Sequence, residues 1–143
     1  MTTTARPTGR PGYSETMPRK PESAATARNL VRVAFGVWGL DDLADDGALI
    51  VSELVGNAVR HARASVIRVT VTQPAPGLVR IGVVDRSQVF PTLRNPDDED
   101  EDDDDAAGGR GLWLVDAMTH RWGTDALPWG KRVWAELRET ERG

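Results

Sequence analysis

The 143-residue sequence has no cysteine, and its aromatic residues are few apart from five tryptophans. Without cysteine there is no disulfide bond and no metal site built on thiolates, which fits a reducing compartment. No apolar run approaches the roughly 18 to 20 residues that a membrane-spanning helix needs. The N-terminal residues lack the apolar stretch of a secretory signal, so we expect a cytoplasmic protein without membrane contacts.

Charge is distributed unevenly along the chain. The net charge is −4, but residues 97–105 are nine consecutive acids, and without them 18 basic residues face 13 acidic ones. The remainder is therefore mildly basic, which suits a ligand that carries phosphate. The excess is too small and too dispersed to predict direct binding of nucleic acid, and no platform of aromatic and basic residues accompanies it.

The spacing of apolar residues predicts one α+β domain. Helices are expected over residues 22–38, 41–64 and 109–122, and strands over 65–73, 77–85, 120–125 and 131–139. Because these elements come in blocks, we expect a two-layer α/β sandwich, with a mixed, mostly antiparallel sheet and about three helices on one face. Residues 1–20, poor in apolar side chains, are expected to form a flexible arm before a domain over 21–140.

The helix expected over residues 41–64 has a narrow polar strip. At about 100° per residue, Glu53, Asn57, Arg60 and His61 fall within about 100° of one another. The side expected to pack on the sheet carries Val51, Val55, Ala58 and Ala62.

Two interpretations of this strip are open. It is either the wet side of an amphipathic helix, which is common, or a site with defined chemistry. Wet sides usually carry many Lys and Glu, whereas Glu53, Asn57 and His61 follow one another at one-turn intervals. Oxygen atoms of amides and carboxylates suit Mg²⁺, which takes other ligands from water and phosphate. A carboxylate one turn away can also deprotonate a nucleophile.

Two further features point toward a ligand. Asp85 ends the apolar run "LVRIGVVD", where a carboxylate needs a partner, either a turn or cap or a ligand's donor. "GGRGL", from Gly108, opens an expected helix whose free N–H groups suit phosphate, although glycine is also common in such loops. The tryptophans are expected to pack in the core and hairpins rather than form a stacking platform; these are Trp113, Trp122, Trp129 and Trp134.

Four segments together resemble a known family. "ELVGNAVRHA", "VVDRS", "GGRGLWLVDAM" and "GKRVWAEL" are similar, in this order, to the N, G1 and G2 boxes and the closing strand of the GHKL ATPase superfamily. Its architecture is called the Bergerat fold. Within it, the histidine kinase-like ATPase domains of small actinobacterial anti-sigma-factor serine/threonine kinases are most similar, over residues 22–138.

The resemblance implies ATP and Mg²⁺ as cofactors and assigns roles to individual residues. Asn57 would ligate Mg²⁺, Glu53 would act as the catalytic general base, and Asp85 would accept a hydrogen bond from the exocyclic amine of adenine. Residues 91–107 would form an acidic ATP lid, with Gly108 as its hinge. The other implied nucleotide contacts are Arg60, His61, Ser87, Gly109, Arg110, Gly111 and Leu112.

The resemblance further implies an anti-sigma factor that phosphorylates a Ser or Thr of an anti-anti-sigma partner protein. Binding of a sigma factor would be its competing, stoichiometric function. A homodimer is also possible, since dimers are common in this family. The first alternative is a catalytically weak or inactive ATP-dependent interaction module. The second is an α+β binding domain whose boxes are coincidental. Glu53 and Asn57 together favour the kinase. Two departures from the superfamily favour the module. One is the short acidic lid, and the other is Arg86-Ser87-Gln88, where the superfamily has glycines after its Asp. We expect the Arg86 side chain to point outward.

The acidic run leads to a first prediction. Closed over a triphosphate, nine acids would repel it, so we expect the lid to stay open or to fold onto the basic body. Replacing residues 97–105 by a Gly/Ser linker should leave the affinity for ATP, measured by calorimetric titration, equal or tighter. Markedly weaker binding would show instead that the acids help to recruit the metal.

Overall fold

The computed structural model describes residues 6–7, 12–61, 65–86 and 113–139. Residues 113–118 are helical. The other elements are β1 (Arg6–Pro7), β2 (Gly12–Pro18), α1 (Ser23–Val37), the 3₁₀ turn η1 (Asp41–Leu43), α2 (Ala44–His61), β3 (Val66–Ala75), β4 (Leu78–Asp85), β5 (Arg121–Leu127) and β6 (Gly130–Arg138).

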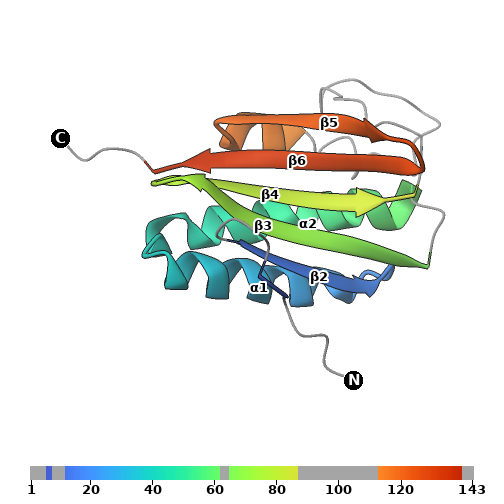
Figure 1. Ribbon diagram of the computed structural model, residues 1–143, viewed down its shortest axis with the longest axis horizontal. Coiled ribbons are helices and arrows are strands. Elements are labelled where there is room, and N and C mark those ends of the chain that lie inside the picture. Colours follow the sequence, from blue (N-terminus) through green and yellow to red (C-terminus); the bar gives the residue numbers. More distant parts are fainter. Residues whose placement is uncertain (1–5, 8–11, 62–64, 87–112, 140–143) are drawn as a thin grey trace.

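The strands form one sheet in the order β1-β2-β3-β4-β6-β5, and every neighbouring pair is antiparallel. The helices α1 and α2 lie side by side on one face of it (Figure 1). This arrangement confirms the predicted α+β sandwich of two layers. The described sheet is antiparallel throughout because hairpins join β3 to β4 and β5 to β6, and β4 then pairs with β6.

The end of α1 follows from its sequence. The helix buries one apolar stripe, which includes Leu30, Val31 and Phe35, and it stops where Gly39 adopts a φ of 70°. The amide of Gly39 donates to the carbonyl of Gly36, and the amide of Leu40 donates to that of Phe35 over 2.8 Å. This pair of hydrogen bonds is a Schellman motif, which requires a residue with positive φ. The expected stop signal at Gly39 is confirmed.

The flexible arm expected over residues 1–20 is wrong for Gly12–Pro18, which form strand β2 and pair with β3 along their whole length. Met17 is buried in the core, and the ring of Tyr13 lies 6.0 Å from that of Trp38. Arg19 then donates to the carbonyl of Val59 over 2.9 Å, in the last turn of α2. Few apolar residues suffice here because backbone hydrogen bonds and this helix cap hold the segment.

The face of the sheet toward the helices forms the core. Side chains alternate along each strand, so every second residue points to this face. Nine buried aliphatic residues from the three central strands share it; they are Ile67, Val69, Val71, Val79, Ile81, Val83, Val133, Ala135 and Leu137.

The opposite face of the sheet, termed the open face, holds a buried acid. Glu136 of β6 is fully buried there, and it accepts hydrogen bonds from Arg80 of β4 and Arg121 of β5. Both guanidinium groups also lie over the ring of Trp134, at 5.1 and 5.4 Å from its centroid. Burial acts to raise the pKa of Glu136, but the hydrogen bonds and charges of Arg121 and Arg80 prevail and lower the pKa.

No helix in the described parts of the chain is long and apolar enough to cross a membrane.

Glu136 generates a prediction about stability. Glu136→Gln should lower the free energy of unfolding at pH 7 by about 1 to 3 kcal/mol, because hydrogen bonds to a charged acceptor are lost. A carboxylate with a lowered pKa stabilises the fold above its ordinary pKa, here 4.5, and this contribution is lost as the pH falls through the lowered value. The difference between wild type and variant should therefore shrink in acid, as measured by urea unfolding at several pH values.

The control is Glu139→Gln, because Glu139 lies just beyond the same strand and is exposed. It should leave the stability nearly unchanged. A Glu136→Gln protein as stable as the wild type at pH 7 would contradict this account of the open face.

Candidate functional site

The polar strip of α2 is not uniformly exposed to solvent. Glu53 is half-buried and Arg60 is exposed, whereas Asn57 between them is only 3% exposed. The interpretation of this strip as the wet side of an amphipathic helix is therefore wrong for Asn57. A buried amide has to satisfy its donors and acceptors within the protein or with a ligand.

The apolar side of α2 packs as predicted. Val51, Val55 and Ala58 are buried, and the helix contacts strands β4 and β6. Ala62, the fourth residue expected on this side, lies outside the described residues. α2 thus holds Glu53 and Asn57 in fixed positions on the layer that covers the sheet.

Asp85, the last residue of β4, forms a buried ion pair with Lys131. The two residues are direct partners in the β4–β6 register, and Lys131 Nζ lies 3.2 Å from Asp85 Oδ1. Both side chains are almost completely buried, at 1% and 0% exposed. Asp85 lies two positions after Val83, and Lys131 lies two positions before Val133. Both valines point toward the helices, so the pair lies on the same side of the sheet as α2.

Gly130 fixes the backbone at this point. A Cβ atom on Gly130 would lie 2.0 Å from the carbonyl oxygen of Asp85 and 2.8 Å from Cα of Arg86. Both contacts are with backbone atoms, so any side chain at Gly130 would push the end of β4 away. Glycine therefore permits the close approach that places Asp85 opposite Lys131.

Lys131 receives no site role in the sequence analysis. The signal that identifies it is the alternation Lys131-Val133-Ala135-Leu137, which places a lysine on the buried face of a strand. A lysine at such a position needs a carboxylate partner, and the only acidic residue that the predicted sheet offers at a buried strand end is Asp85.

The remaining predicted site residues stay predictions. Ser87, Gly109, Arg110, Gly111 and Leu112 lie outside the described residues, as do Gly108 and the lid at 91–107. His61 is the last residue of α2, but its side chain is not described. Arg86 is exposed, which confirms that it points outward.

Two of the tryptophans depart from the packing expected for them. Trp129, in the turn between β5 and β6, is 54% exposed, and Trp113 is also exposed. Trp122 does pack against the core.

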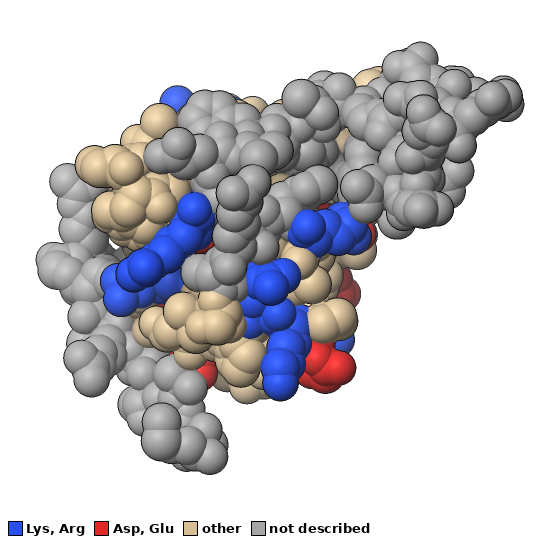
Figure 2. Space-filling model, turned by 90° about the vertical axis from the view of Figure 1, so that its right-hand side faces the viewer, with Lys and Arg blue, Asp and Glu red and all other residues tan. Residues whose placement is uncertain are grey.

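The donor set fits a nucleotide with its magnesium ion. Within the described ranges, no group of three or more His, Asp or Glu residues is arranged to hold a metal. Mg²⁺ does not require such a group when phosphate oxygens and water complete its shell, and one buried amide such as Asn57 then suffices. The end of the molecule where β4 stops shows many Lys and Arg side chains and few acids on its described surface (Figure 2), which favours an anionic ligand.

A carboxylate in the position of Asp85 is also able to read a nucleobase. It has two oxygens and about four acceptor positions, so a base amine can share it with Lys131. Because the site is buried, a hydrogen bond formed there is stronger than one made in water.

Comparison with known proteins agrees with this geometry. Residues 17–136 match the family of the histidine kinase-like ATPase domain. One similar solved structure is the histidine kinase domain from the Erythrobacter litoralis EL346 blue-light activated histidine kinase, with 19% identity and a TM-score of 0.47. The match covers 85% of this chain and 61% of that chain, so this chain spans less than two thirds of that structure's length. A comparison with curated proteins gave no match. Because the family match covers most of the sequence, the chain belongs to the histidine kinase-like ATPase domain family.

Proposed function

We propose that this protein binds ATP with Mg²⁺ between α2 and the sheet, and that it is an anti-sigma factor with serine/threonine kinase activity toward an anti-anti-sigma partner. The observation that carries the proposal is the placement of Asp85 and Asn57. One is a buried carboxylate at a strand end, and the other is a buried amide on the helix that covers that face. Family membership adds support for the nucleotide, while the partner rests on the sequence resemblance.

Each residue has a distinct task in this proposal. Asp85 accepts a hydrogen bond from the amine of adenine, which favours adenine over a base with a carbonyl group at that position. The amide oxygen of Asn57 holds Mg²⁺. Bound Mg²⁺-ATP supplies the phosphoryl group and neutralises charge on the phosphate oxygens. Glu53, half-buried one turn from Asn57, takes the proton of the acceptor hydroxyl.

The second candidate is an interaction module that binds ATP but transfers phosphate weakly or not at all. Arg86-Ser87-Gln88, where the superfamily has glycines, favours it. Lys131 bears on both candidates, because this buried cation already engages the oxygen Oδ1 of Asp85. A nucleobase then has to share or replace the contact, which reduces the free energy that binding can contribute. The two candidates predict the same binding site and differ only in catalysis.

Binding is tested by thermal unfolding with and without Mg²⁺-ATP. At 100 times the dissociation constant, the ligand should stabilise the wild type by about 2.7 kcal/mol. Asp85→Asn should abolish this stabilisation, because an amide has a single acceptor oxygen, for which Lys131 competes, and its NH2 group is a donor that repels the base amine. Glu53→Ala should retain it. No stabilisation of the wild type would refute both candidates.

Asp85→Asn needs its own control, because it also leaves Lys131 buried without its anion. That loss alone should destabilise the unliganded protein by about 3 to 5 kcal/mol. The double variant Asp85→Asn/Lys131→Met removes both charges and should recover part of the stability, so the two effects are not additive. If nucleotide also stabilises this double variant as much as the wild type, Asp85 does not read the base.

Catalysis is tested by transfer of labelled phosphate to a candidate anti-anti-sigma protein. Wild type should transfer label to a Ser or Thr, and Glu53→Ala should reduce the rate by about 10²- to 10⁴-fold, the range of a positioned general base. Glu53→Gln keeps the shape of the side chain and should be equally impaired. Binding of ATP without transfer by the wild type would favour the interaction module.

A further inference from the structure

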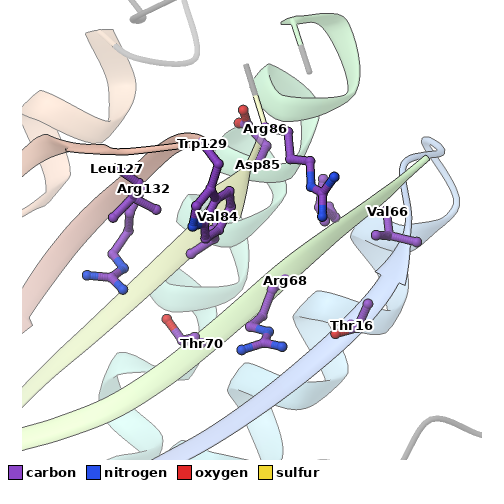
Figure 3. Close-up of a pocket in the computed structure, with 11 residues that line it drawn as sticks. Thr16, Val66, Arg68, Thr70, Val84, Asp85, Arg86, Leu127, Trp129 and Arg132 are labelled. Carbon is purple, nitrogen blue, oxygen red and sulfur yellow. The ribbon is translucent and has the colours of Figure 1, made fainter. Parts of the chain in front are cut away.

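The open face of the sheet carries a groove that borders the proposed nucleotide site at Asp85. Its volume is about 470 Å³, within the range of ligand sites. The lining comes from β2, β3, β4, β5, the β5–β6 turn and β6 (Figure 3). It includes Arg68, Val84, Arg86, Trp129, Arg132 and Val66.

The strand register accounts for the groove. Thr16 pairs with Arg68, Arg68 with Val84, and Val84 with Arg132, so these four residues form one row across four neighbouring strands. Neighbouring strands are about 4.8 Å apart, which places the backbones of Arg68 and Arg132 about 10 Å apart with Val84 between them. The row therefore places an apolar side chain, Val84, between two cationic ones, with the polar Thr16 at its end.

The cations of the groove are weakly neutralised. Arg68 and Arg86 form no hydrogen bond or ion pair within the part of the chain that the structure describes, and both are exposed. A guanidinium nitrogen of Arg132 lies 3.7 Å from Oδ2 of Asp125, which is a long ion pair, and that carboxylate is half exposed. The three guanidinium groups lie around the groove and do not converge on one point (Figure 3).

The walls between these cations are apolar and partly open to solvent. Trp129 is 54% exposed and Val66 is 46% exposed, while Val84 forms the floor at 8%. Tryptophan and arginine are both enriched at the centres of protein interfaces, and here an exposed tryptophan lies among arginines with few acidic partners in the described part of the chain.

We infer that this groove docks an acidic peptide segment of a partner protein in which carboxylates alternate with apolar or aromatic side chains. A single phosphate or sulfate would need donors that converge, whereas these arginines are spread across three strands. An extended peptide matches the spread, because its side chains alternate as those of the sheet do. Each guanidinium pairs with a carboxylate, and the apolar side chains cover Val84, Val66 and Trp129.

The chain's own acidic run fits this groove less well. Residues 97–105 are all Asp or Glu, so they satisfy the arginines but supply no apolar side chain for Trp129 or Val66. The proposed partner segment satisfies both.

The inference is independent of the proposed nucleotide function. Asp85 borders the groove. The side chains of Arg68 and Arg132 point to the open face, whereas those of Asp85 and Lys131 point toward the helices, so substitution of Arg68 or Arg132 leaves the residues of the nucleotide site in place.

The test is fluorescence anisotropy with the full chain and a labelled peptide of about ten residues in which Glu alternates with Leu and Phe. The peptide should bind the wild type, with an affinity that falls as salt is added. Arg68→Gln and Arg132→Gln should each weaken binding at least about tenfold, the value of one charged hydrogen bond. Trp129→Ala should also weaken it.

Arg138→Gln is the matched control, because Arg138 is exposed near the end of the same strand β6 and outside the groove. It should bind the peptide as the wild type does, and all variants should keep the thermal stabilisation by Mg²⁺-ATP.

Three outcomes would overturn the inference. Equal binding of an all-Glu peptide of the same charge would show that only charge is recognised. Binding that appears only after residues 97–105 are replaced by Gly/Ser would assign the groove to the chain's own run. A dimer that dissociates in Arg68→Gln, measured by sedimentation, would assign it to a second copy.

Discussion

The buried ion pair between Asp85 and Lys131 is the constraint on which the functional end of the structure depends. Two charges without water around them are tolerated only when each satisfies the other, so the ends of β4 and β6 have to meet at this point. Gly130 removes the side chain that would keep them apart. The pair also keeps an acceptor on the face that α2 covers, and the assignment of a nucleobase to this place rests on that acceptor.

The sheet separates two kinds of chemistry. In β4 and β6 the residues that face the helices are aliphatic until Asp85 and Lys131, so this pair places its polar groups at one end of the layer between these strands and α2. The open face instead carries arginines, and one buried acid, Glu136, organises two of them around Trp134. Those two share the charge of Glu136, whereas Arg68 and Arg86 have no acidic partner among the described residues. Regulation by nucleotide on one face and protein docking on the other is compatible with this separation.

The sequence predicted what local periodicity controls. Both helices and both hairpins follow from apolar spacing, and Asp85 follows from the need of a carboxylate at the end of an apolar strand for a partner. Strand β2 could not be predicted, because its stability comes from backbone pairing with β3 and the bond from Arg19 to Val59 rather than from its own apolar residues. The role of Lys131 could not be predicted either, since it depends on a strand register that brings together residues 46 positions apart. The glycines after the lid remain a prediction from sequence.

The most direct measurement of the central claim is a crystal structure of the full chain with a non-hydrolysable ATP analogue and Mg²⁺. The account predicts the amine of adenine within hydrogen-bond distance of a carboxylate oxygen of Asp85, and Mg²⁺ bound to the amide oxygen of Asn57. Adenine elsewhere, for example in the arginine groove of the open face, with Asp85 bonded to Lys131 and making no contact with the base, would contradict it.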